Sequence, residues 1–384
     1  MNKTPCFIFS EHLYRYEFHD SHPFHPIRLR MTMDLINRMH LLKKNQIIPP
    51  RLATEEELTL IHDPLYIDKL IRAGRGELTH EQMVQIGIDT DDNPHFPDMH
   101  EVASYVVGGT LVAMEQVMSN QACHALHLGG GLHHALRGKA SGFCLYNDAA
   151  VAIAKIRDEY DAKVLYIDTD AHHGDGVQWA FYNDPQVFTI SIHETGKYLF
   201  PGTGAVYERG EELGFGSNIN IPLDAFTEDD SWLYAFEQVI PKVIQEFKPD
   251  VIFSQHGCDA HRTDPQTHLA ATMNIYRLIP QYLHQWAHQW CEGRWIAVGG
   301  GGYDLYRVVP RAWTYLWAEM TDHPLNDEPI PMDWINHWQA QSPVSLPLTF
   351  HDPDGTFPPI PRRAEITEFN ERIVKRILLF LEGY

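Results

Sequence analysis

Five ionisable side chains follow one apolar run near the middle of the chain. The run Val164–Ile167 is typical of a buried strand. It leads into three aspartates and two histidines: Asp168, Asp170, His172, His173 and Asp175. Burying so many ionisable groups after a strand costs folding free energy, so we expect them to have a function. Asp170 and His172 can hold a divalent metal through oxygen and nitrogen, whereas the alternative is a loop that only caps the following helix.

A third metal ligand is expected from a second loop. Asp259 follows the apolar run Val251–Ser254, within the stretch QHGCDA, whereas Asp264 is better explained as a turn residue. Three protein ligands leave one position of a metal open to water or substrate, which is the arrangement of catalytic sites. The sequence therefore predicts a catalytic metal centre at Asp170, His172 and Asp259.

Two consecutive histidines supply candidates for acid–base chemistry. His133 and His134 follow three glycines, and each needs an acceptor on its far ring nitrogen to be oriented. Asp168 and Asp175 remain free once the metal ligands are assigned. We therefore predict two His–Asp dyads beside the metal, against the alternative of a glycine turn with two structural histidines.

Aromatic residues in three glycine-containing loops complete the candidate site. Tyr303 follows four glycines and could donate a hydrogen bond to a developing oxyanion, or it could simply pack under the turn. Phe143 and Phe200 could form the walls of an apolar channel for a linear alkyl group. For these two rings, ordinary core packing is an equally good explanation.

Short apolar runs alternate with helical stretches along most of the chain. Strands are predicted at 5–9, 124–128, 164–167, 187–192, 251–254 and 295–298, with a further candidate at 217–222. Helices are predicted at 27–42, 99–118, 148–160, 176–183, 229–247, 271–290 and 304–320. This alternation predicts an α/β fold, a mainly parallel central sheet flanked by helices on both faces. Polar and glycine clusters follow the strands, where such folds keep their sites.

The domain organisation is expected to be simple. No internal repeat or low-complexity linker divides the sequence, so we expect one domain over residues 1–384. Residues 322–364 are rich in proline and are predicted to wrap over the surface. An amphipathic helix is predicted at 364–382.

The composition limits the partners and the compartment. The 384 residues carry a net charge of −21 and no basic run, which disfavours nucleic acid and anionic membranes as partners. Basic partners such as lysine-bearing proteins would be attracted, or the acidic surface serves only solubility. Five scattered cysteines without a C-x-x-C motif indicate a reducing compartment. No signal peptide and no 18-residue apolar span occur, so we expect a cytoplasmic protein; the oligomeric state is not predicted.

Six segments together resemble the histone deacetylase superfamily, and most closely its bacterial acetoin-utilisation branch, which is similar to class I. In chain order they are GGGLHH, SGFCLYNDAAVAI, LYIDTDAHHGDGVQWAFY, SIHETGKYLFPGTG, QHGCDAHRTDP and GGGGYD, with weaker matches at HPFHPIRLRMT and TDDNPHFPDMHE. The resemblance implies an arginase–deacetylase fold and a zinc-dependent hydrolase that releases acetate from acetylated lysine.

The resemblance also implies a role for each matching residue. Asp170, His172 and Asp259 match the zinc ligands. Among the catalytic residues, His134 matches the general base and acid, and His133 matches its electrostatic partner. Asp168 matches the carboxylate behind His133, and Asp175 matches the one behind His134. Tyr303 matches the phenol that polarises the substrate carbonyl. The substrate tunnel is matched by Gly142, Phe143 and Phe200, its rim by Asp92, and an internal acetate cavity by Arg28. A structural potassium ion would use Asp168, Asp170, His172, Ser191 and Ile192.

Several points stay open at this stage. Gln266 and Cys258 depart from residues common in the family, which leaves the preference for acyl length and the thiol sensitivity undecided. Fe²⁺ could replace Zn²⁺ in the cell. The substrates could be acetylated metabolic enzymes, acetyl-CoA synthetase above all, or small acetylated amines such as acetylpolyamines. A ureohydrolase with two manganese ions and a non-catalytic binder of acetylated proteins are the remaining alternatives.

Overall fold

A parallel sheet runs through the centre of the molecule. The computed structural model describes residues 3–326 and 328–382. Within them the eight strands lie in the order β2-β1-β3-β8-β7-β4-β5-β6, and every pair of neighbours is parallel. The strands are β1 Cys6–Ile8, β2 Ile47–Ile48, β3 His124–His127, β4 Val164–Asp168, β5 Val187–Glu194, β6 Asn218–Leu223, β7 Val251–Gln255 and β8 Trp295–Val298. The predicted parallel sheet is confirmed, and 217–222 is indeed a strand.

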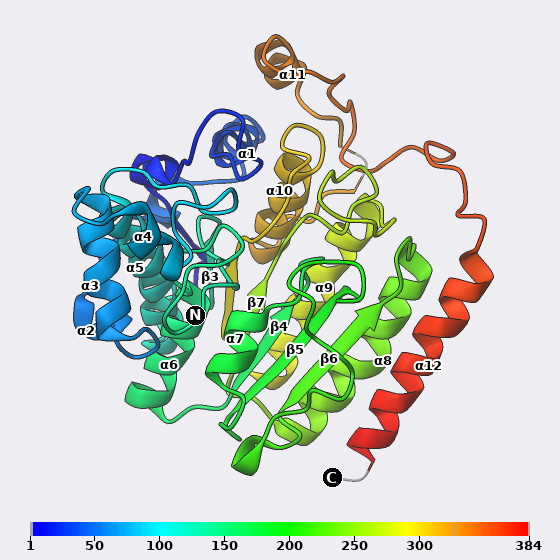
Figure 1. Ribbon diagram of the computed structural model, residues 1–384. Helices are drawn as coiled ribbons and strands as arrows, with labels where there is room; N and C mark the ends of the chain where they lie inside the picture. Colours follow the sequence, from blue (N-terminus) through cyan, green and yellow to red (C-terminus); the bar gives the residue numbers. More distant parts are fainter. Residues whose placement is uncertain (1–2, 327, 383–384) are drawn as a thin grey trace.

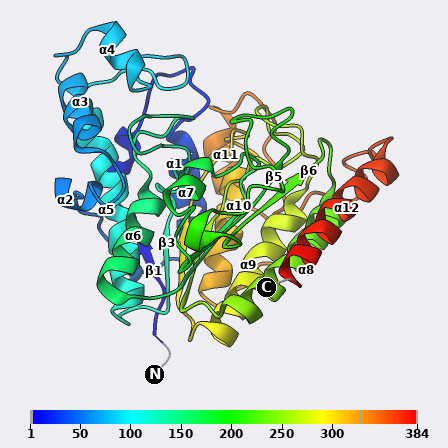
Figure 2. The same ribbon diagram turned by 60° about the horizontal axis from the view of Figure 1, so that its bottom comes forward.

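Helices cover both faces of this sheet (Figures 1 and 2). On one side lie α2 Glu55–Leu58, α3 Pro64–Gly74, α5 Met99–Met118 and α6 Asp148–Tyr160. The other side carries α1 Ile27–Arg38, α8 Asp229–Phe247, α9 Met273–Trp290, α10 Val309–Met320 and α12 Arg363–Leu381. Strands β3 to β8 are buried along their whole length, because helices shield both faces.

Several element boundaries differ from the predictions for local reasons. Helix α1 ends four residues before the predicted position 42, and His40 takes a left-handed conformation with φ of 57°. Helix α10 begins at Val309 rather than at 304, and residues 305–308 form turns in which the backbone carbonyl of Asp304 accepts the N–H groups of Val308 and Val309. Strand β2 and the short helices α4 His80–Gln85 and α7 Asp175–Ala180 complete the region before residue 200. Of these, α7 had been predicted.

The proline-rich segment 322–364 follows the surface and is tied to the core. It contains helix α11 Met332–Gln339, which was not predicted. The indole N–H of Trp334 donates to the carbonyl of Met31, and that of Trp338 donates to Asp34 on α1. The buried apolar residues form one cluster that reaches from Cys6 to Leu381. This supports our proposal of one domain over the whole chain.

No helix within the described residues is both long enough and apolar enough to cross a membrane.

A buried ion pair fastens this C-terminal segment to α10. Arg311 is only 3% exposed, and its Nη2 donates to Oδ1 of Asp352 at 3.0 Å. Oδ2 of Asp352 accepts the backbone N–H of Met273 and lies 2.9 Å from Nε2 of His261. Burial alone would raise the pKa of Asp352, but the His261 hydrogen bond and the Arg311 charge hold it well below the usual value. The charged form of this carboxylate is therefore the stabilising one.

We predict that Asp352→Asn lowers the free energy of unfolding at pH 7 by about 3 kcal/mol, because it leaves a buried guanidinium without its counter-charge. Since the folded-state pKa is lowered, the carboxylate's contribution is complete above the unfolded value of about 3.9 and is lost as the pH falls below it. Urea unfolding at pH 7 and pH 3 measures both effects. The exposed Asp354→Asn serves as the control, and equal stabilities of the two variants at pH 7 would contradict the prediction.

Candidate active site

All of the predicted chemical groups lie where four neighbouring strands end. Strands β3, β8, β7 and β4 are adjacent at the middle of the sheet. The loops after them carry, respectively, the two histidines His133 and His134, Tyr303, Asp259, and the pair Asp170 and His172. Because parallel strands end at one edge of a sheet, residues from distant parts of the sequence meet there.

The predicted metal ligands form a compact buried group. Asp170, His172 and Asp259 each offer one ligand atom, and these atoms lie within 4.8 Å of one another. Nδ1 of His172 lies 3.1 Å from Oδ1 of Asp170 and 2.9 Å from Oδ2 of Asp259. Strand β4 ends at Asp168, so Asp170 and His172 lie in the bend after the strand and not on its extended part.

The remaining oxygen atoms of this group are held by N–H donors. Oδ2 of Asp170 accepts the side-chain N–H of Gln255 at 2.8 Å and the backbone N–H of Gly301 at 2.7 Å. Oδ1 of Asp259 accepts the backbone N–H of Ala171 at 2.8 Å. A Cβ atom at Gly301 would collide with the Asp259 carboxylate, which explains the glycine there. Two anchored carboxylates and an imidazole suit a divalent metal such as zinc.

Each of the two histidines has the expected carboxylate behind it. Nδ1 of His133 lies 2.7 Å from Oδ2 of Asp168, which also accepts the Tyr166 hydroxyl. Nδ1 of His134 lies 2.7 Å from Oδ1 of Asp175. The two Nε2 atoms are 3.0 Å apart. Both dyads are thus formed, and the two rings share a hydrogen bond.

The surroundings give the two imidazoles different proton affinities. Burial would lower the pKa of His133, but the charges of Asp168 and Asp170 outweigh it and raise this pKa to about 9. Burial and the neighbouring His133 and His172 lower the pKa of His134 well below its usual value. The carboxylates around His133 therefore favour its protonated form, whereas the surroundings of His134 favour its neutral form.

Tyr303 and two phenylalanines surround these groups. The ring of Phe143 lies 5.8 Å from that of Tyr303, and the ring of Phe200 lies 5.0 Å from that of His134. Phe143 has a positive φ of 69°, and its carbonyl accepts the Tyr16 hydroxyl. Phe200 is 43% exposed, so it does not belong to the core.

The residues expected farther from the metal are less tightly connected to it. Nη1 of the buried Arg28 donates to the carbonyls of Gly300 at 2.8 Å and Gly302 at 3.3 Å. Arg28 therefore contacts the glycine loop that carries Tyr303, and the acetate cavity stays a prediction. Asp92 lies exposed in the loop between α4 and α5. Ser191 pairs in register with Asp168, and the potassium site at these residues and Ile192 stays a prediction.

Asp148 is the main site residue that the sequence did not indicate. It begins α6, and its carboxylate accepts the backbone N–H groups of Gly131 and Leu132 and the hydroxyl of Thr110. It therefore fixes the loop that carries the histidine pair. Asp264, expected to be a turn residue, accepts the backbone N–H of Tyr303 at 2.7 Å. A lone Asp at a helix start looks like an ordinary cap, so only the fold reveals its target.

Comparison with known proteins now decides the family. Residues 22–320 match the model of the histone deacetylase domain. The chain belongs to the histone deacetylase family. It is 55% identical over 376 residues to the acetoin utilization protein AcuC of Bacillus subtilis (strain 168), covering 98% of this chain and 97% of that protein. It is 42% identical over 383 residues to AcuC of Staphylococcus aureus (strain MRSA252), covering 100% and 98%.

Solved structures agree with this assignment. A crystal structure of a histone deacetylase homologue from Aquifex aeolicus has a TM-score of 0.85 and 29% identity, covering 96% of this chain and all of that one. The same values hold for a homologue complexed with SAHA. The chain therefore has the arginase–deacetylase fold expected from the resemblance. As a deacetylase of this family it is a hydrolase of amide bonds, and the family implies a divalent metal.

We predict that Asp148→Asn lowers kcat/KM about 100-fold, since a small displacement of the histidine loop is enough to cost that much. Asparagine cannot accept all the N–H groups that the carboxylate holds. The metal content should not change, because Asp148 contacts none of the three metal ligands. Acetate release, metal per chain and circular dichroism test this, with the exposed Asp158→Asn on the same helix as the control. Full activity in Asp148→Asn would contradict the positioning role.

Proposed function

We propose that the protein is a zinc-dependent lysine deacetylase that hydrolyses N-ε-acetyl-lysine in proteins or peptides to lysine and acetate. The observation that carries the proposal is the convergence of a buried Asp–His–Asp group, two His–Asp dyads and Tyr303 at one sheet edge. Zinc held by Asp170, His172 and Asp259 would supply a Lewis acid and lower the pKa of water, and Fe²⁺ could serve the same purpose.

The side chains then have distinct tasks. His134 takes a proton from the attacking water at Nε2, while Asp175 holds its Nδ1–H and so its tautomer. The Tyr303 hydroxyl donates to the oxyanion that develops on the acetyl oxygen. Burial raises the pKa of Tyr303 well above 10, so this donor keeps its proton at neutral pH. A histidine of the pair returns a proton to the departing lysine amine, and acetate leaves along the cavity near Arg28.

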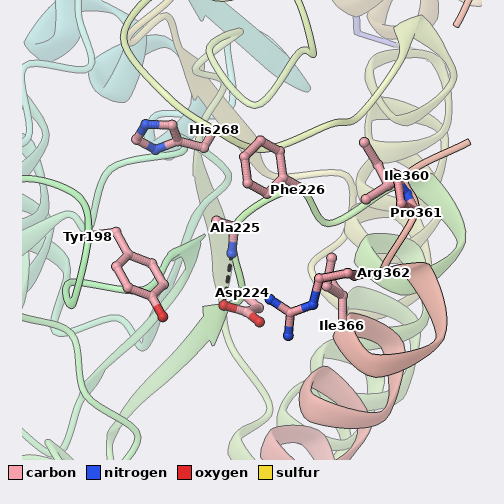
Figure 3. A pocket seen from close by; sticks show the side chains of 9 residues that line it. All are labelled: Tyr198, Asp224, Ala225, Phe226, His268, Ile360, Pro361, Arg362 and Ile366. Carbon is pink, nitrogen blue, oxygen red and sulfur yellow. Dashed lines mark hydrogen bonds between the residues drawn. The ribbon is translucent and has the colours of Figure 1, made fainter. Parts of the chain in front are cut away.

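The residues expected to line the channel, together with a nearby groove, support acetyl-lysine within a polypeptide as the substrate. Gly142, Phe143 and Phe200 would enclose the apolar part of the lysine side chain, and Asp92 would grip the substrate backbone at the rim. A groove of about 650 Å³ lies directly after the last residue of β6, at the same edge of the sheet as the metal group (Figure 3). Its walls include Tyr198, close in sequence to Phe200, with Phe226 across from it. Such a groove offers room for residues flanking the acetylated lysine.

The physiological substrates are proposed from the relatives. Proteins named for acetoin utilization suggest acetylated metabolic enzymes, such as acetyl-CoA synthetase. We place this activity in the cytoplasm, since all five cysteines are free thiols. The net charge of −21 also suits lysine-bearing partners. Deacetylation of small acetylated amines remains the alternative function, because the channel alone would accept them.

We predict that the zinc-loaded enzyme has a higher kcat/KM for an acetyl-lysine peptide than for an acetylated polyamine, because only the peptide reaches the groove. Tyr303→Phe should lower kcat for both substrates by roughly 10²- to 10³-fold, the effect of one lost oxyanion donor. Acetate release measures both.

The groove variant Phe226→Ala separates the two functions. It should raise KM for the peptide and leave KM for the acetylated polyamine unchanged. A preference for the polyamine would support the small-amine alternative, and near-normal turnover in Tyr303→Phe would remove this hydroxyl from the mechanism.

A further inference from the structure

Three histidines meet at the opposite end of the sheet from the active site. His124 is the first residue of β3, whereas the active-site loops follow the last residues of the strands. His284 and His288 are four residues apart on α9, and therefore lie on one face of that helix. The ring centroids of the three imidazoles are 4.8 Å, 5.0 Å and 4.9 Å apart. A four-residue strand alone spans roughly 13 Å, so this cluster is separate from the Asp170 group.

The spacing of the ring nitrogens matches that of ligands on one metal ion. Nε2 of His124 lies 3.2 Å from Nε2 of His288. With zinc–nitrogen bonds of about 2.0–2.1 Å, two ligands of a tetrahedral ion are about 3.3–3.4 Å apart. One nitrogen from each of the three rings lies within 4.8 Å of the others. For all three nitrogens to bind one ion, the third must therefore move closer to the other two by at most about 1.5 Å.

The surroundings orient one of these rings and leave another incompletely bonded. Nδ1 of His284 lies 3.0 Å from a carboxylate oxygen of Glu319 on α10, which leaves its Nε2 free to bind. A carboxylate behind a histidine is the usual support of a metal ligand. His124 is 1% exposed, and its Nδ1 has no hydrogen-bond partner among the described residues. The Nε2 atom, which faces His288, is the nitrogen that this ring presents to an ion.

Burial also disfavours a proton on one ring of the cluster. Burial lowers the pKa of His124 to about 3, and the neighbouring His284 and His288 add to this effect. Neutral imidazoles are ligands for zinc, copper and nickel rather than for magnesium or calcium. His288 is exposed, so an ion can reach the cluster from solvent.

We propose that His124, His284 and His288 form a second metal site. It binds a divalent transition metal, preferably zinc. Asp322 can contribute to the fourth position, since its exposed carboxylate has an oxygen 3.9 Å from Nε2 of His284. The bound ion ties the start of β3 to α9, and through Glu319 to α10. The site is structural, because none of its ligands reaches the active edge.

The test is metal content per chain after dialysis of the holoenzyme against micromolar zinc. We expect two ions per chain in the wild type, and one in His288→Ala and in His284→Gln. Gln289→Ala, an exposed neighbour on the same helix, should keep two. Acetate release should be unchanged in His288→Ala, since the remaining ion is the catalytic one. Equal numbers of ions per chain in the wild type and in the two histidine variants would overturn the proposal.

Thermal unfolding gives a second readout that does not depend on activity. Because a ligand that binds only the folded state stabilises it, added zinc should raise the Tm of the wild type and of Gln289→Ala. It should raise the Tm of His288→Ala less. Equal increases in all three proteins would also count against the site.

Discussion

The active site depends on packing two like-charged carboxylates around one imidazole in the interior of the protein. Asp170 and Asp259 are almost fully buried, and both contact Nδ1 of His172. Negative charges brought out of water and next to each other are unfavourable unless a positive charge joins them. Burial and the nearby Asp170 accordingly raise the pKa of Asp259 to about 6. A divalent cation is the simplest way to satisfy this arrangement.

The other contacts at this edge of the sheet hold the two carboxylates and the histidine pair in place. The side-chain amide of Gln255 and the backbone N–H of Gly301 hold Asp170, and Gly301 can approach so closely because it has no side chain. His133 and His134 stand beside this anionic centre, where a cationic imidazole is stabilised. Asp148 anchors the loop that bears them, from a helix on one face of the sheet. The parallel strands matter because they bring these loops to one edge.

Much of this arrangement could be predicted from the sequence, because the strongest signals are local. Buried strands appear as apolar runs, and the ionisable residues follow them directly, so the sheet, most helices and the grouping of the ionisable residues could be predicted. Contacts between distant segments have no such signal. The anchoring by Asp148 and the Arg311–Asp352 pair connect residues that lie 16 to 41 positions apart. Helix α11 was missed because its packing on α1, and not its own sequence, stabilises it.

The central claim is that one metal ion at Asp170, His172 and Asp259 makes the site catalytic. The most direct measurement is a zinc titration of metal-stripped protein, followed by acetate release from an acetyl-lysine peptide. The His288→Ala protein is best suited, since the histidine cluster then does not compete for zinc. The account predicts that activity returns in proportion to bound zinc and reaches its plateau at one ion per chain. Folded protein that stays inactive with zinc, or that needs two ions or manganese, would contradict it.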